Sequence, residues 1–593
     1  MVRSSSRGSR GGHRSVIRWF PLIFIACGTP ESTDGEVVIS SDVESIRIDP
    51  AEVTIETGGE APTEVQFTAW ATTKEGEEVE TSMVSWAISN LSAGSIDENG
   101  TFLSSTLNGG VTNVTATHVG IEGSATVTIV YKKDLVTGDL PAGIVDAFDA
   151  ATSTSGDEPA LDYPHDGVTV PRNLNGLAFA WDAPPGSNVS RIRLQSGITD
   201  MRVYTSDELW YSDSDLWATI SASNTGGEVD VVVESGMWDG SALTSVVQGP
   251  PLQLTVNRLD ARGSVLYWVA RTDGSAGAAG DIMRIPFGST EAEAFWSFED
   301  AGGECVGCHT LVESENKMIV THAGVNGNFS VIDISDPDAP ELMLGVEEER
   351  RATFHAASPD GQHLLAVANG QARLYSLRTG ELMQTIDTEG YQVSHPDWSP
   401  DGEDIVLVRV HETYMSDMNF EGGEIIQMSF DGSNFGPAEV LVPHSSEYNN
   451  YYPAYAPDGN WIAFNRAVRT EIRSPDGSIH ESSTSYANPS AELWLVGRDG
   501  DHLTKLDNAN SVGELQNSFP RWGPLPDDDV LWLAFSTTRE YEVDPSERNL
   551  PQIWLSAIEP EKALDGVDPS SVAFWLPAQD SQSDNHLAIW WSK

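Results

Sequence analysis

The residues of this chain with the most specific chemistry are two cysteines and a histidine in the run Cys305-Val306-Gly307-Cys308-His309. Two thiols three positions apart can add to the two vinyl groups of one haem. A histidine directly after the second cysteine can then ligate the iron through an imidazole nitrogen. The whole sequence contains three cysteines, so the pattern predicts one covalent c-type haem held by Cys305, Cys308 and His309.

Three other kinds of site use two cysteines at this spacing. A local Cys305–Cys308 disulfide can form in an oxidising compartment. A thioredoxin-like redox pair needs a strand–helix–strand setting, which the surrounding sequence does not predict. A zinc site needs two further ligands, and the sequence has no second cysteine pair. The structural disulfide therefore stays open as the main alternative to haem.

The N-terminus predicts export, which haem attachment to reduced thiols outside the cytoplasm requires. Residues 1–26 combine a basic start with the apolar run 19–26, which is far too short to span a bilayer. The basic residues are Arg3, Arg7, Arg10, Arg14 and Arg18. We therefore expect residues 1–26 to be a signal peptide and the chain after Cys27 to lack a membrane span.

The junction Phe24-Ile25-Ala26-Cys27-Gly28 resembles the lipobox of bacterial lipoproteins, with Phe24 where that family usually has leucine. The resemblance implies that Cys27 is lipidated and becomes the mature N-terminus, with residues 27–42 as a polar tether. Because Gly28 is not the aspartate associated with inner-membrane retention, the resemblance implies an outer-membrane lipoprotein, on the periplasmic or the surface face. The alternative is an ordinary secretory signal cleaved near Ala26, which would leave a secreted or periplasmic protein.

Charge and composition restrict the class of partner. The chain has 33 Lys plus Arg against 89 Asp plus Glu, a formal net charge of −56, so it lacks the basic surface that nucleic-acid binding needs. Hydrophobic residues make up 39% of the sequence, which is enough to build packed cores and argues against a disordered acidic chain. At 593 residues the chain should contain several domains.

Two β-sandwich domains are predicted before the haem motif. Residues 43–131 alternate apolar and polar positions between Gly, Asn and Pro turns. The phrases Ile48-Asp-Pro50 and Val84-Ser-Trp86 resemble a bacterial immunoglobulin-like domain of group 2, which implies a spacer. Residues 132–160 are rich in Gly, Asp, Ser and Thr and read as a linker. Short alternating strands over 161–258 predict a second sandwich.

An internal repeat occupies residues 259–593 and predicts a β-propeller. Pro-Asp-Gly turns at 359–361, 400–402 and 457–459 each lie between strand-like runs, at a spacing of roughly forty to sixty residues. The phrase Pro396-Asp-Trp-Ser-Pro-Asp-Gly402 resembles the TolB-like family of periplasmic propellers. The fold class is therefore all-β, with two sandwiches followed by a propeller of roughly six blades, seven being the alternative. The C-terminal run 587–591 can close the ring.

The repeat also places the haem motif inside a blade. An ungapped alignment of neighbouring repeats sets His309 on His355, and equivalent residues of innermost strands face the same end of a propeller channel. We therefore expect His355 to be the distal ligand of the iron, with His395, Met318 and His322 as competitors. The alternatives are that His355 is a hydrogen-bonded residue of the channel wall, and that the distal side is open.

These features predict an envelope lipoprotein that binds one haem c and acts in electron transfer or haem-based sensing. Its expected partners are a redox or cell-envelope protein and, through the lipid anchor, the membrane. The alternative is a non-redox interaction propeller with a structural Cys305–Cys308 disulfide. Hydrolase and transferase motifs are absent from the sequence: it has no Gly-x-Ser-x-Gly elbow, His411-Glu412 lacks the second histidine of His-Glu-x-x-His, and no phosphate-binding loop occurs. Peroxidase-like activity would require an open distal side.

Overall fold

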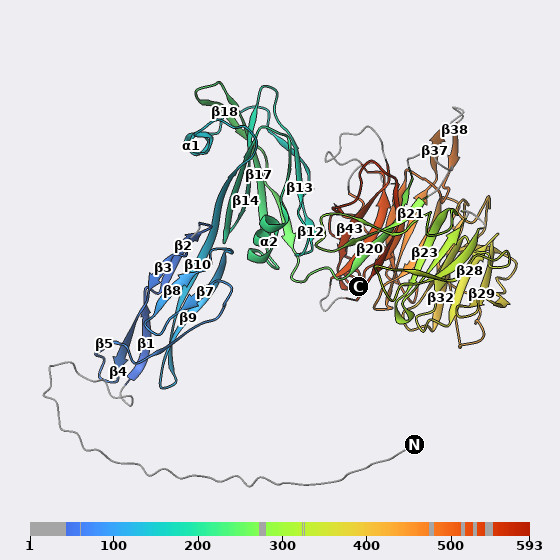
Figure 1. The fold of residues 1–593 in the computed structure, drawn as a ribbon, viewed down its shortest axis with the longest axis horizontal. Coiled ribbons are helices and arrows are strands. Elements are labelled where there is room, and N and C mark those ends of the chain that lie inside the picture. Colours follow the sequence, from blue (N-terminus) through green and yellow to red (C-terminus); the bar gives the residue numbers. More distant parts are fainter. Residues whose placement is uncertain are drawn as a thin grey trace, which may run out of the picture.

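The computed structural model describes residues 43–59, 61–271, 280–322, 324, 327–473, 479–511, 516–525, 530–539 and 550–593. The predicted signal peptide and the lipidated tether, including Cys27, lie outside these residues. Nearly every regular element is a strand, which confirms the all-β prediction. Over the described ranges, the helices are too short and too polar to cross a bilayer. Figure 1 shows two elongated β-domains leading to a propeller.

The first domain is a β-sandwich, as its alternating sequence predicts. In β9, for example, alternate residues from Gly110 to His118 are buried, which is the period of two that a half-buried strand requires. The inward residues, among them Phe67, Phe102 and Val127, form one core. The strands are β1 (Val43–Asp49), β2 (Glu52–Thr57), β3 (Glu64–Gln66), β4 (Thr68–Thr73), β5 (Glu78–Thr81), β6 (Ser85–Ile88), β7 (Gly94–Ile96), β8 (Thr101–Ser104), β9 (Gly110–His118) and β10 (Ile121–Val136).

The second domain shares a sheet with the first. The end of β10 runs parallel to β15, with Tyr131 opposite Thr199 and Val136 opposite Tyr204, so that one ten-stranded sheet passes through both domains (Figure 1). The elements are α1 (Ile144–Ala150), β11 (Ala160–Tyr163), β12 (Val168–Val170), β13 (Ala178–Asp182), β14 (Val189–Ser196), β15 (Thr199–Thr205), β16 (Leu209–Tyr211), α2 (Ser214–Ser223), β17 (Glu228–Trp238), β18 (Leu243–Gln248) and β19 (Leu252–Val256).

The segment expected to be a linker, residues 132–160, thus contains regular structure at two places. Residues 132–136 continue β10, and residues 144–150 form α1. The charged start Lys132-Lys133-Asp134 resembles a loop in sequence, but these side chains are partly or fully exposed while their backbone pairs with β15. The connection between the two domains is therefore a hydrogen-bonded strand.

Six four-stranded sheets form the propeller, one for each blade. Blade 1 contains β45 (Asn585–Trp591), β20 (Ser264–Ala270), β21 (Gly280–Pro286) and β22 (Glu293–Trp296). Blade 2 contains β23 (Val306–Val312), β24 (Lys317–His322), β25 (Asn328–Asp333) and β26 (Glu341–Leu344), and blade 3 contains β27 (Phe354–Ala357), β28 (His363–Ala368), β29 (Gln371–Ser376) and β30 (Leu382–Thr385).

The remaining blades come from the C-terminal half of the repeat region. Blade 4 contains β31 (Gln392–Trp398), β32 (Asp404–Val410), β33 (Gly423–Ser429) and β34 (Glu439–Val442). Blade 5 contains β35 (Tyr448–Tyr455), β36 (Trp461–Val468), β39 (Ala491–Gly497) and β40 (Thr504–Lys505), with the hairpin β37 (Thr470–Arg473) and β38 (Ile479–Ser482) between β36 and β39. Blade 6 contains β41 (Ser518–Trp522), β42 (Leu531–Thr537), β43 (Gln552–Ile558) and β44 (Phe574–Trp575), with the short helix α3 (Glu561–Leu564) before β44.

The C-terminal strand closes the ring, as expected from the sequence. β45 pairs antiparallel with β20 and becomes the innermost strand of blade 1. The six innermost strands contact one another in the order β23, β27, β31, β35, β41, β45 and back to β23. The described residues therefore build six blades. We call the face at which these innermost strands begin the mouth face.

The second domain packs against the outer strands of blade 6. The Tyr163 hydroxyl accepts a hydrogen bond from the Trp575 backbone at 3.1 Å, and the Tyr163 and Trp554 rings meet edge to face at 6.1 Å. The His165 ring stacks on Trp554 at 6.4 Å. The apolar core of the second domain is continuous with that of the propeller, so the two are joined by a buried interface.

Removing a buried side chain of the closing strand should destabilise the whole propeller. Trp591 is fully buried in β45, so Trp591→Ala should lower the free energy of unfolding by about 3–5 kcal/mol in urea titrations. The control is Leu382→Ala on β30, because Leu382 is 52% exposed and its loss should cost less than about 0.5 kcal/mol. Equal effects of the two substitutions would contradict closure by β45.

The interface between the second domain and the propeller should weaken in acid. Burial, aided by the charge of Arg539, lowers the pKa of His165 to about 4. Below pH 6.5 the unfolded chain takes up a proton that folded His165 does not, so stability falls between pH 6.5 and 4. The urea midpoint of His165→Leu should therefore fall less from pH 7.5 to pH 5 than that of the wild type. His502→Asn, at an exposed histidine, should keep the wild-type change of urea midpoint with pH. If His165→Leu also kept that change, His165 would not be the group responsible.

Candidate functional site

The predicted haem motif lies at the start of the innermost strand of blade 2. Cys305 directly precedes β23, while Cys308 and His309 belong to the strand. Val306 and Val312 are buried between blades and explain why this segment is a strand. A bulge between Val306 and His309 shifts the register, and the Trp268 indole holds the bulge by donating to the Val306 carbonyl at 2.6 Å. The motif therefore opens onto the mouth face.

One side chain from each blade closes the central channel at the level of Cys308. The residues at this position, counted back from the turn that follows each innermost strand, are Cys308, Phe354, His395, Tyr452, Phe519 and Leu587. Ring centroids are 4.5 Å apart for Phe354 and His395, 3.9 Å for His395 and Tyr452, and 4.1 Å for Tyr452 and Phe519. We call this layer the channel plug. A positive φ between 45° and 55° at four of its members, with strand bulges beside them, directs these side chains inward.

His309 and His355 occupy the next position along neighbouring innermost strands. Both are buried, at 4% and 5% exposure, and neither ring has a hydrogen-bond partner within the described part of the chain. The His355 ring lies near His309 and the backbone of Cys308. Burying an imidazole without a hydrogen bond is costly, and a ligand that bonds to these ring nitrogens would remove that cost.

Burial keeps both imidazoles neutral. It lowers the pKa of His309 to about 4. The backbone groups of Leu266 and Gly307 have a smaller, opposite effect on this pKa, although they lie outside hydrogen-bonding geometry. Burial lowers the pKa of His355 to about 3. Neutral imidazole is the form that ligates a metal. The pair is therefore ready for metal ligation near neutral pH.

The three competing ligands have different surroundings. His395 is part of the channel plug, and its Nδ1 accepts a hydrogen bond of 3.4 Å from the Tyr452 backbone. His322 is hydrogen-bonded through Nε2 to Ser330 at 2.7 Å and lies near Cys305. Met318 is fully buried in the core between blades 1 and 2. His355 is thus the candidate that shares the environment of His309, and its role as distal ligand stays a prediction.

The cysteines do not have the properties of a redox pair or a zinc site. Cys305 and Cys308 are not joined by a disulfide. Burial raises the pKa of Cys308 to about 12 and also raises that of Cys305, whereas a reactive redox thiol needs a lowered pKa. Across the described ranges, no three His, Cys, Asp or Glu side chains gather as a metal cluster.

Two charged residues lie one position beyond the histidines, and sequence reasoning missed them. Asp397 is in β31 and Arg521 is in β41, each directly after the proline of a bulge. Burial raises the pKa of Asp397, whose Oδ2 accepts from the Tyr455 backbone at 2.7 Å. The Arg521 charge lowers the pKa values of Cys308, His309 and His355, which places a cation beside the motif. Both residues could have been found in the sequence by their distance from the turn that follows each innermost strand.

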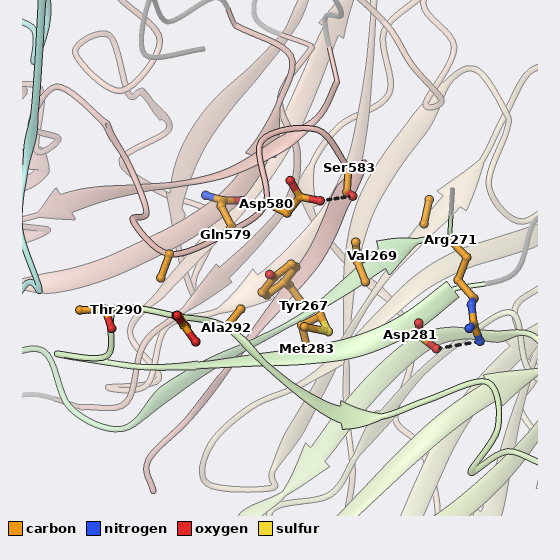
Figure 2. Close-up of a pocket in the computed structure, with 13 residues that line it drawn as sticks. Tyr267, Val269, Arg271, Asp281, Met283, Thr290, Ala292, Gln579, Asp580 and Ser583 are labelled. Atoms are coloured by element: carbon orange, nitrogen blue, oxygen red, sulfur yellow. Dashed lines mark hydrogen bonds and ion pairs between the residues drawn. The ribbon is translucent and has the colours of Figure 1, made fainter. Parts of the chain in front are cut away.

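Two cavities lie near this region, and neither is lined by Cys305, Cys308 or His309. One, of about 220 Å³, opens on the mouth face and is bounded by Tyr452 and Phe519 of the channel plug. The other, of about 590 Å³, lies on blade 1 beside the loop that leads into β45. Figure 2 shows Tyr267 at its centre, with Asp580 directed to Ser583 and Arg271 to Asp281.

The donor set fits a c-type haem. The cysteine spacing and the two unpartnered, neutral histidines have the required chemistry. Cys305 and Cys308 are partly exposed, while His309 is buried.

Comparisons with known proteins do not assign the chain to a family. No family model matches. An uncharacterized peptidase, YuxL of Bacillus subtilis (strain 168), is 31% identical over 146 residues, which is 20% of this chain. The match spans 22% of that relative.

Two of the solved structures that resemble part of this chain match it at low TM-score. A putative TolB from Agrobacterium tumefaciens is 17% identical, with a TM-score of 0.30, over 55% of this chain and 98% of that chain. An oligogalacturonate lyase in complex with manganese is 16% identical, with a TM-score of 0.27, over 51% of this chain and 73% of that chain. The propeller assignment itself rests on the six closed sheets described above.

The two cysteines should differ in reactivity when no haem is attached. At pH 8 a thiol whose pKa is about 12 is almost entirely protonated, so iodoacetamide should alkylate Cys308 at least about tenfold more slowly than Cys305. Peptide mass spectrometry over a time course measures both rates, and the difference should disappear in urea. Equal rates in the native protein would show that the channel plug does not raise the pKa of the Cys308 thiol.

Proposed function

We propose that this protein is an exported lipoprotein, anchored to the outer membrane through Cys27, which carries one haem c and acts in electron transfer or haem-based sensing. Cys305 and Cys308 attach the haem, His309 is the proximal ligand and His355 is the distal ligand. The observation that carries the proposal is a pair of buried histidines whose four ring nitrogens have no hydrogen-bond partner among the described residues. The His355 ring lies near the Cys308 backbone.

When bound, the haem supplies one-electron redox chemistry. The chain contributes ligation by His309 and His355, which neighbouring strands hold in fixed positions. The aromatic channel plug keeps water from one side of the histidines, and low polarity around a haem is one way in which a protein sets its potential. The Arg521 charge, which acts on both histidines, favours the more negative, reduced state of the site.

The other domains support a role at a membrane surface. The sheet that joins the two sandwiches would hold the propeller away from the lipid anchor as a stiff spacer. A formal charge of −56 favours association with a partner that presents a basic docking surface. The partner class that fits is a basic redox or cell-envelope protein.

A second candidate function is a non-redox interaction propeller of the cell envelope. It is favoured by the burial of His309 and His355 on neighbouring innermost strands. In that case His309 and His355 pack between blades, and Cys305 and Cys308 oxidise to a structural disulfide in the periplasm.

Periplasmic expression with a haem-attachment system distinguishes the two candidates. The reduced pyridine spectrum should show one haem c per chain, and Cys308→Ser should lose the second thioether. His355→Ala should keep the haem and alter the oxidised and reduced spectra, because it removes an axial ligand. His502→Asn, at the exposed histidine of blade 5, is the matched control and should leave both spectra unchanged.

A colourless wild-type protein with a Cys305–Cys308 disulfide would refute the haem proposal. Retention of haem with spectra of His355→Ala identical to those of the wild type would refute the distal assignment and leave His309 as the proximal ligand.

A further inference from the structure

The cavity of about 220 Å³ on the mouth face contains polar groups without partners. It lies between blades 5, 6 and 1 and is lined by Tyr451, Tyr452, Asn488, Phe519, Asp584 and His586, among others. It is separate from the predicted haem ligands, which are on blades 2 and 3. Residues from three blades and from the connection between β38 and β39 converge on it.

Asn488 presents a buried hydrogen-bond donor to this cavity. The side chain is 2% exposed, and its Oδ1 accepts from the Ser490 backbone at 2.9 Å and from the Ser490 hydroxyl at 2.7 Å. These two bonds fix the orientation of the amide. Its Nδ2 then has no partner within the described part of the chain, so a ligand atom that accepts a hydrogen bond would satisfy it.

Two tyrosines and a histidine add further polar groups. Tyr451 and Tyr452 are 1% and 2% exposed, and over the described ranges no hydrogen bond is made by either hydroxyl. Burial raises the pKa of Tyr452, as do the nearby Tyr451 and Cys308, and Tyr486 also lines the cavity. Burial lowers the pKa of His586 to about 4, so this ring is neutral, and its Nδ1 has no described partner.

The walls are aromatic, and the described lining residues include no basic side chain. The Tyr452 and Phe519 rings are 4.1 Å apart, and His586 meets Phe519 edge to face at 6.4 Å. Among the described lining residues the one charged group is Asp584. Its carboxylate favours a neutral ligand over an anion. A ligand with hydroxyls that both donate and accept, together with an apolar face, matches the walls.

We propose that this cavity binds one ring of a neutral sugar. The apolar C–H face of the sugar packs on the Tyr452 and Phe519 rings. Its hydroxyls accept from Asn488 Nδ2 and from the tyrosine hydroxyls and donate to the Asp584 carboxylate. A volume of about 220 Å³ suits a single hexose-sized ring, such as the end of a glycan. The site is independent of haem attachment.

The test uses glucose, galactose and N-acetylglucosamine as probes with the full mature chain, in saturation-transfer NMR and calorimetry. At least one sugar should bind the wild type. Tyr452→Phe should weaken it roughly 3- to 10-fold, the effect of one hydrogen bond. The fold should be unaffected because this hydroxyl makes no hydrogen bond with the described residues. Asp584→Asn should also weaken binding.

The matched control is Tyr267→Phe. Tyr267 is likewise a buried tyrosine, at 1% exposure, but it belongs to the other cavity on blade 1 (Figure 2). This substitution should leave sugar affinity unchanged. Binding is measured on chains produced with and without haem attachment, so failure of the sugar proposal is distinguishable from failure of the haem proposal.

Three results would overturn the sugar site. They are no binding of any of the three probes to the wild type, an equal loss of affinity in Tyr267→Phe and Tyr452→Phe, and displacement of the bound sugar by tetramethylammonium at the same site. The last result would identify the aromatic walls and Asp584 as a cation site.

Discussion

The antiparallel pairing of β45 with β20 is the constraint on which the propeller depends. It joins the end of the chain to the first strand of the repeat region, with Ile589 opposite Leu266. Bringing such distant segments together has an entropic cost that grows slowly with loop length, and the burial of Trp591 between blades 1 and 2 offsets it. Without β45, blade 1 would have no innermost strand and the ring would stay open.

Closure also creates the environment of the haem motif. Leu587 of β45 completes the channel plug beside Cys308, and Trp268 of the neighbouring β20 holds the bulge that leads to His309. The chemistry assigned to five consecutive residues therefore depends on strands from both ends of the propeller. The same holds for the cavity on the mouth face, which includes His586 of the closing strand.

Much of the architecture could be predicted because short-range sequence patterns indicate it. The Pro-Asp-Gly turns identified the blades, and the ungapped repeat placed His309 and His355 on neighbouring innermost strands, where the structure has them. The continuation of β10 into the second domain could not be predicted, because residues 132–134 are charged and their pairing with β15 is a tertiary contact. Arg521 and Asp397 were missed although their positions can be counted back from the turns that follow the innermost strands. The mouth-face cavity could not be predicted, because strands far apart in sequence form it.

The structure leaves one central claim to be tested, namely that Cys305 and Cys308 hold a haem. The most direct measurement is the mass of the proteolytic peptide that contains residues 305–309, isolated from protein exported in a host that attaches haem. The account predicts a peptide heavier by one haem, with both cysteines protected from alkylation. A peptide lighter by two hydrogens, as a Cys305–Cys308 disulfide requires, or an unmodified peptide with two alkylatable thiols, would contradict it.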